Sequence, residues 1–182
     1  MYAAHTRGSA VEPNVLPALI AVLASTGDAA RYEAFLERFR KAATPQEEQR
    51  YLYALTAFPQ PALVEQTLAR TINGEIRTQD APFVVRSVLM LVHSREAAWA
   101  FVKKQWDTMD RLYPKHGLRR MAEGVIGLAT PELEADVHRF FQERRIELGG
   151  KTLEQYLEQL RVVVALRERE RGALAGYLAR FA

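Results

Sequence analysis

Residues 147–157, ELGGKTLEQYL, contain Gly-Lys-Thr, the triplet that ends a phosphate-binding loop. Such a loop needs another glycine five positions before the triplet, on a turn that follows a β-strand. Arg145 occupies that position, and the residues before it have the period of a helix. We therefore expect a hinge between two helices, in which Gly149 or Gly150 ends one helix and Thr152 caps the next.

The histidines and serines, which could bind zinc or attack a carbonyl, have no catalytic spacing. A metallopeptidase helix carries two histidines four residues apart, and here the histidines are scattered: His5, His93, His116 and His138. Glu134 and His138 are one helical turn apart and could share a metal, but an ordinary i, i+4 pair is the favoured interpretation. No serine lies in a nucleophile-elbow motif, and the chain contains no cysteine. The residues themselves therefore predict no catalytic centre and no cofactor in this chain.

An aromatic group surrounds Lys103 and Lys104 and could indicate nucleic-acid binding through base stacking. Its members are Trp99, Phe101, Trp106 and Tyr113. Trp99 and Trp106 recur at the spacing of a buried helix face, so we favour core packing. The net charge is only +3, from 25 basic and 22 acidic residues, and runs such as 167–171 alternate in sign. We therefore expect no nucleic-acid partner.

The elements that would position any site are helices. Thr44 to Glu47 forms a capping box with proline at the first helical position, and Thr130 and Pro131 open another helix. Ser94 is expected to cap a third. The periodicity predicts helices near 13–25, 28–42, 45–57, 60–73, 79–93, 95–113, 117–128, 131–147, 152–168 and 170–181. The segment from Phe83 to Val92 is apolar nearly all round, so it predicts a buried central helix.

These helices predict an all-α fold. Short connections make neighbouring helices antiparallel, and the pairs begin near residues 28, 59, 94 and 130, a step typical of helical repeats. We expect antiparallel pairs stacked as a curved, HEAT-like α-solenoid with a concave binding face. Residues 1–182 are predicted to form one domain, with residues 1–12 irregular. No run of roughly 18 apolar residues occurs, which predicts no membrane partner.

Several stretches, taken in order, resemble one family. They are Thr44 to Leu55, Ile76-Arg77-Thr78-Gln79-Asp80, Ala98-Trp99-Ala100-Phe101-Val102 with Trp106, Phe140-Phe141, and Leu157-Glu158-Gln159-Leu160-Arg161. Together they resemble the C-terminal helical domain of M1-family zinc aminopeptidases, in the branch of the puromycin-sensitive and endoplasmic-reticulum antigen-trimming enzymes. The resemblance covers roughly residues 11–182.

The resemblance implies a non-catalytic C-terminal domain that belongs to a longer enzyme. Its partners would be the N-terminal and catalytic domains of the same parent chain and a peptide substrate. Zinc would lie in the parent enzyme, which removes N-terminal residues from peptides, and this domain would wall the substrate chamber and cap the active site. The compartment is left open, because the start of the chain shows no signal-peptide pattern and the parent's own N-terminus is not in view.

Tyr53 is the one residue that the resemblance singles out. It falls where relatives place an aromatic side chain facing the chamber, and some of them carry a basic residue one turn later, where this chain has Ala57. Tyr53 is therefore a candidate substrate-wall residue, with ordinary packing as its alternative. The alternative for the whole chain is a freestanding HEAT-like scaffold that binds a protein or peptide.

Overall fold

The computed structural model of the chain describes residue 12 and the ranges 14–144 and 151–181. These ranges form helices joined by short turns, and none of their residues is in a β-strand. The helices are α2 (Leu16–Ser25), α3 (Ala29–Arg40), α4 (Pro45–Leu55), α5 (Pro61–Arg70), α6 (Ala81–Leu89), α7 (Arg95–Leu112), α8 (Lys115–Ala122), the 3₁₀ helix η1 (Glu123–Gly127), α9 (Pro131–Glu143) and α10 (Thr152–Leu178). The predicted all-α class is confirmed over these residues.

Local signals account for several helix starts. Thr44 and Thr130 each accept a hydrogen bond from the backbone N–H three residues later, at the start of α4 and α9. Asp28 does the same for α3. Each cap satisfies a backbone donor that the helix leaves free and contributes about 1 kcal/mol. Capping at Thr44 and Thr130 was predicted from the sequence.

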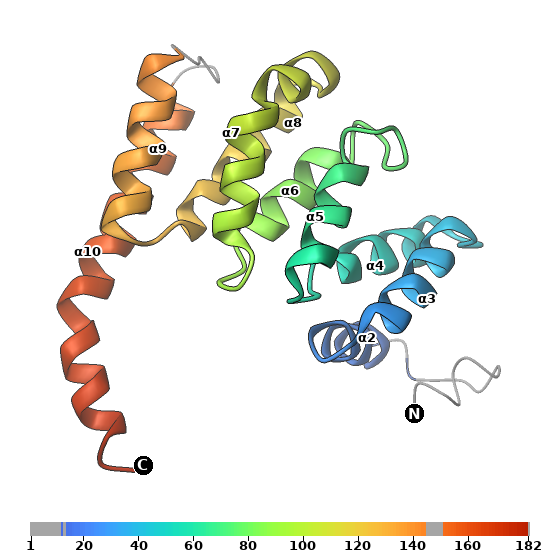
Figure 1. Ribbon diagram of the computed structural model, residues 1–182, viewed down its shortest axis with the longest axis horizontal. Helices are drawn as coiled ribbons and strands as arrows, with labels where there is room; N and C mark the ends of the chain where they lie inside the picture. Colours follow the sequence, from blue (N-terminus) through green and yellow to red (C-terminus); the bar gives the residue numbers. More distant parts are fainter. Residues whose placement is uncertain (1–11, 13, 145–150, 182) are drawn as a thin grey trace.

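The helices lie in two layers, as Figure 1 shows. One layer holds α3, α5, α7 and α9, and the other holds α4, α6, α8 with η1, and α10. Within the second layer α4 contacts α6, α6 contacts α8 and η1, and both of these contact α10. Four elements from distant parts of the sequence therefore lie next to one another in a row.

The buried apolar side chains form one continuous cluster between the layers, running from Leu16 to Val164. The rings of Trp99 and Trp106 both meet the ring of Phe140 edge-on, with centroids 5.1 and 5.5 Å away. Both indoles are almost fully buried. The prediction that they belong to the core is confirmed, and neither ring is available for stacking on nucleic-acid bases.

The C-terminal region differs from the prediction of two helices, 152–168 and 170–181. α10 is continuous from Thr152 to Leu178, because the run 167–171 consists of arginine and glutamate, which favour helix and do not end it. Its second half extends beyond α9 in Figure 1, and the last buried residue of the helix is Val164.

One predicted cap is wrong, and another is correct in position but not in its hydrogen bond. Lys151 occupies the N-cap position of α10, and Thr152 is already helical. Ser94 occupies the predicted N-cap position of α7, but its hydroxyl donates to the Val88 carbonyl at 2.9 Å instead of accepting from the new helix, because Ser94 is buried against the end of α6. The predicted hinge glycines, Gly149 and Gly150, lie outside the described residues.

The central predicted helix, 79–93, is shorter than expected. α6 ends at Leu89, and Val92 is 75% exposed although it belongs to the apolar run. The predicted helix 117–128 is α8 followed by η1, which runs close to the end of α6. A Cβ on Gly127 would lie 2.5 Å from the Leu89 carbonyl oxygen, so only glycine permits this approach.

Candidate functional site

Tyr53 lies on the exposed side of the second layer, at one end of the row of helices. Its side chain projects from α4 and is 39% exposed. Partial burial raises the pKa of its hydroxyl, the negative charge of Asp80 raises it further, and the positive charge of Arg86 opposes the rise. The hydroxyl therefore stays protonated at neutral pH and can donate a hydrogen bond to a ligand.

Asp80, at the start of α6, is held in place by two side chains. Gln49 of α4 donates to one carboxylate oxygen at 3.2 Å, and the Nε of Arg77 donates to the other at 3.1 Å. The Arg77 guanidinium also reaches Glu48 at 2.5 Å. This network ties α4 to α6 beside Tyr53 and fixes the negative charge that acts on its hydroxyl.

Arg86 and Glu123 form the next contact along the row. The Arg86 guanidinium binds both Glu123 carboxylate oxygens, at 3.1 and 2.9 Å, and so joins α6 to η1. Both side chains are about 30% exposed or less. The paired geometry fixes both planar groups, so the charges here are already partnered and leave little for an ionic ligand.

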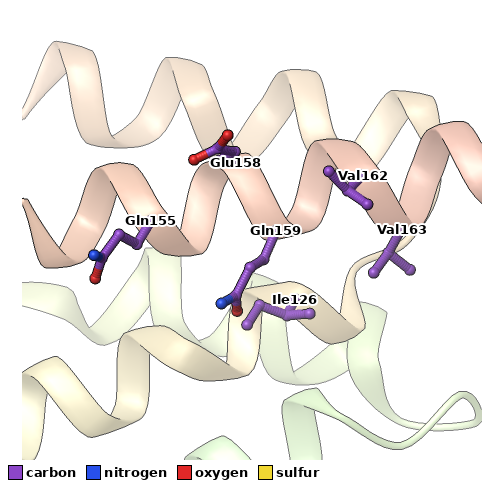
Figure 2. A pocket seen from close by; sticks show the side chains of 6 residues that line it. All are labelled: Ile126, Gln155, Glu158, Gln159, Val162 and Val163. Atoms are coloured by element: carbon purple, nitrogen blue, oxygen red, sulfur yellow. The ribbon is translucent and has the colours of Figure 1, made fainter.

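A groove lies beyond this ion pair, between η1 and α10. Its volume is about 590 Å³, and its lining residues are Ile126, Gln155, Glu158, Gln159, Val162 and Val163. Figure 2 shows Gln159 and Val163 directed from α10 towards Ile126, while Glu158 and Val162, one turn apart, line the same groove farther from Ile126. We call this the Ile126 groove. Its size is that of a pocket for a small ligand or a few peptide residues.

These features form one surface, which we call the α4–α10 face: Tyr53, the Arg86–Glu123 pair and the Ile126 groove. In a 3₁₀ helix side chains three residues apart lie on the same side. Glu123 and Ile126 of η1 have that spacing, so the ion pair and the groove face the same way. The face offers hydrogen-bonding groups and apolar contacts across four elements.

Among the described side chains considered for catalysis, three serines make structural hydrogen bonds. The hydroxyls of Ser25, Ser87 and Ser94 donate to backbone carbonyls of neighbouring residues. The Nε2 of His138 lies 3.9 Å from a Glu134 oxygen, and Arg161 lies at the same distance from that oxygen. Across the described residues, no three histidine, cysteine or acidic side chains are grouped so that they could hold a metal ion.

Lys103, which lies beside the predicted aromatic group, forms an ion pair with Asp136 at the edge of the core. Its ammonium group contacts Asp136 of α9 at 2.5 Å, and the Trp99 indole N–H donates to the same carboxylate oxygen at 2.7 Å. The Lys103 hydrogen bond, more than the Trp99 one, lowers the pKa of Asp136 against the effect of burial. This group joins α7 to α9 and has a structural role.

The resemblance singled out Tyr53 as a candidate, and the rest of the face was not predicted from the sequence. Gln155 and Gln159, four residues apart beside the apolar stripe of α10, were a usable signal for a shared side of that helix. Arg86 and Glu123 are 37 residues apart, and no local pattern relates them. No helix in the described part of the chain is both long enough and apolar enough to cross a bilayer.

Comparison with known proteins gives consistent matches. The model of the ERAP1-like C-terminal domain matches residues 1–162. Aminopeptidase M1-A of Oryza sativa subsp. japonica is 29% identical over 154 residues, which cover 82% of this chain and 17% of that protein. A leucyl aminopeptidase of Saccharolobus solfataricus is 34% identical over 130 residues, covering 66% of this chain and 16% of that protein. The chain thus spans less than a fifth of the length of these two relatives.

Proposed function

Because the chain belongs to the ERAP1-like C-terminal domain family, we propose that it is the non-catalytic C-terminal domain of a zinc-dependent M1 aminopeptidase. The family match over residues 1–162 is the observation that carries this proposal. The names of the relatives support the reaction class, removal of residues from the N-terminus of peptides. We propose that the parent enzyme belongs to the puromycin-sensitive and endoplasmic-reticulum branch of this family.

The rest of the parent enzyme would perform the chemistry. Zinc bound in the catalytic domain would supply an activated water and would polarise the carbonyl of the first peptide bond. The small share of the relatives' length that this chain spans supports the presence of further domains, which are its proposed partners. Zinc belongs to the catalytic domain in this proposal.

The contribution of this chain is a wall for the peptide chamber. Its two layers of paired helices support a curved, HEAT-like stack, and such stacks present extended binding surfaces. The α4–α10 face is the proposed inner surface. Closure of a rigid wall over the active site excludes bulk water and admits peptides in preference to folded proteins.

Tyr53 is the proposed contact between this wall and the substrate. Its hydroxyl is a donor at neutral pH, and its ring provides apolar area beside the Asp80 and Arg86 charges. Peptide carbonyls accept hydrogen bonds, so a neutral tyrosine suits a peptide main chain of any sequence. Ala57, one turn later, provides no charge for a peptide carboxylate.

The proposal is tested in the full-length enzyme with two substrates that differ in length. For Tyr53→Ala we expect KM for a nonapeptide with N-terminal leucine to rise about three- to tenfold, because one hydrogen bond and its apolar contact contribute roughly 1 kcal/mol. Hydrolysis of leucine p-nitroanilide, which is too short to reach the wall, should be unchanged. Tyr177→Ala removes a 56% exposed tyrosine outside the face and is the matched control.

Equal effects of Tyr53→Ala on both substrates, or no effect on either, would remove Tyr53 from the wall. A coding sequence upstream without a zinc-binding motif would contradict the aminopeptidase parentage and favour the freestanding scaffold. The 182-residue chain alone should release no p-nitroaniline in the presence of zinc. Turnover that a chelator abolishes would show that the chain has an active centre of its own.

A further inference from the structure

The Ile126 groove combines three kinds of side chain. Ile126, Val162 and Val163 provide apolar surface, and Val162 is 61% exposed to solvent. The two carboxamides of Gln155 and Gln159 add hydrogen-bonding groups, and a single carboxylate, Glu158, adds charge. No basic residue lines the groove. The lining therefore favours a ligand that is partly apolar, rich in hydrogen-bonding groups and positively charged at one point.

The carboxamides match a peptide main chain. Each glutamine side chain carries one acceptor oxygen and two donor hydrogens. Gln155 and Gln159 are one turn apart on α10 and project from the same side, as Figure 2 shows. A peptide unit also presents one acceptor and one donor, so two such side chains can each pair with one peptide group of an extended segment.

The Glu158 carboxylate favours a positively charged side chain in the ligand. Among the salt bridges of the described residues, none reaches its carboxylate; Arg161, one turn along α10, is instead directed to Glu134 of α9. A carboxylate beside Val162 and Val163 suits a lysine or arginine side chain, whose aliphatic stem packs on apolar surface while its charged end stays in water. An acidic side chain at the same point would be repelled.

We propose that the Ile126 groove binds a short extended peptide segment that carries a lysine or arginine side chain. Gln155 and Gln159 hydrogen-bond the main chain, the aliphatic stem of the basic residue lies on Val162, and its cation pairs with Glu158. The inference rests on the proposed function, because it makes the groove a second substrate contact on the α4–α10 face.

The distance between the two ends of the face fits one peptide. From α4 to α10 there are three steps between neighbouring elements, each of about 8–10 Å, or roughly 27 Å in all. An extended chain rises about 3.3 Å per residue, so roughly eight residues span this length. A peptide that contacts Tyr53 can therefore also reach the groove, and a tripeptide cannot.

The direct test titrates the ¹⁵N-labelled 182-residue chain with three capped peptides of the form acetyl-Ala-Leu-X-Leu-Ala-amide, in which X is Lys, Gln or Glu. Two-dimensional NMR follows the side-chain amides of Gln155 and Gln159. We expect these signals to shift on addition of the Lys peptide, with a Kd about three- to fivefold lower than that of the Gln peptide. This is the range that a solvent-exposed ion pair provides. The Glu peptide should bind most weakly.

Two variants isolate the charge. Glu158→Gln should remove the preference for Lys while leaving the Gln peptide's Kd within about 1.5-fold, since the main-chain contacts remain. Glu168→Gln removes another exposed acid elsewhere on α10 and should keep the full preference. Both sites are on the helix surface, and circular dichroism checks that both variants fold.

Shifts that avoid Gln155 and Gln159, or a Lys preference that survives in Glu158→Gln, would overturn the proposal. So would amide shifts that follow protein concentration without peptide, because a second copy of the chain would then occupy the groove. These results concern the groove alone. A positive Tyr53 result in the full-length enzyme would keep the proposed function even if the peptides fail to bind here.

Discussion

Replacing Thr67 by valine is expected to lower the free energy of unfolding by about 2 kcal/mol. Thr67 of α5 and Tyr32 of α3 are both fully buried, and their hydroxyl oxygens are 2.9 Å apart. The Thr67 oxygen also lies 2.9 Å from the Leu63 carbonyl and 3.2 Å from the Leu55 carbonyl. Since a hydroxyl has one proton, Thr67 donates to a carbonyl and accepts from Tyr32.

The magnitude follows from what the substitution leaves behind. Valine has nearly the shape of threonine, so the change removes one polar group and opens no large cavity. The buried Tyr32 O–H then loses its acceptor, although Arg70 still interacts with its oxygen, and an unsatisfied buried donor costs about 1–3 kcal/mol. Tyr32→Phe alone loses the hydrogen bond, at about 1 kcal/mol. The double variant removes both polar groups together, so its cost should fall below the sum of the two by about 1–2 kcal/mol.

Urea unfolding monitored by circular dichroism at 222 nm measures all three variants, and unchanged m-values would show that the denatured state is comparable. Thr78→Val, at an exposed position, is the control and should stay within about 0.5 kcal/mol of the parent chain. If Thr67→Val costs as little as this control, or if the two single effects add, the buried hydroxyl pair is not coupled and the reasoning fails.

Gly127→Ala should cost about 2 kcal/mol or more, because its Cβ would lie 2.5 Å from the Leu89 carbonyl oxygen and 2.7 Å from the Met90 Cα. Gly172→Ala is the matched control, since nothing lies within 4 Å of its Cβ, and it should stabilise α10 by about 0.5–1 kcal/mol in the same urea assay. Burial raises the pKa of Tyr113 to about 12. Because the unfolded chain then loses this proton at lower pH than the folded chain, the stability that the neutral Tyr113 hydroxyl provides is intact below pH 10 and is lost as pH rises from 10 to 12. The loss is about 3 kcal/mol in all, roughly half of it by pH 11, so urea unfolding at pH 9, 10 and 11 should show this half in the parent chain and a smaller loss in Tyr113→Phe, where Tyr32 and Tyr53 still titrate.

The local features of this chain could be predicted because their causes are local. The caps at Thr44 and Thr130 depend on residues within one turn, and the burial of Trp99 and Trp106 follows from their spacing on one helix. The continuity of α10 was not predicted, because the charged run 167–171 resembles a junction between two helices. The helix persists there since no residue in the run opposes it strongly.

The sequence by itself determined that the chain is helical, where most helices begin and which large side chains form the core, and its resemblance pointed to the family. These properties depend on interactions between residues a few positions apart. Only the tertiary structure brought Arg86 to Glu123, closed Gly127 against Leu89, and placed Ile126 opposite Gln159. Those contacts join residues 33 to 38 positions apart, so they arise from how the helices stack, which no short-range pattern encodes.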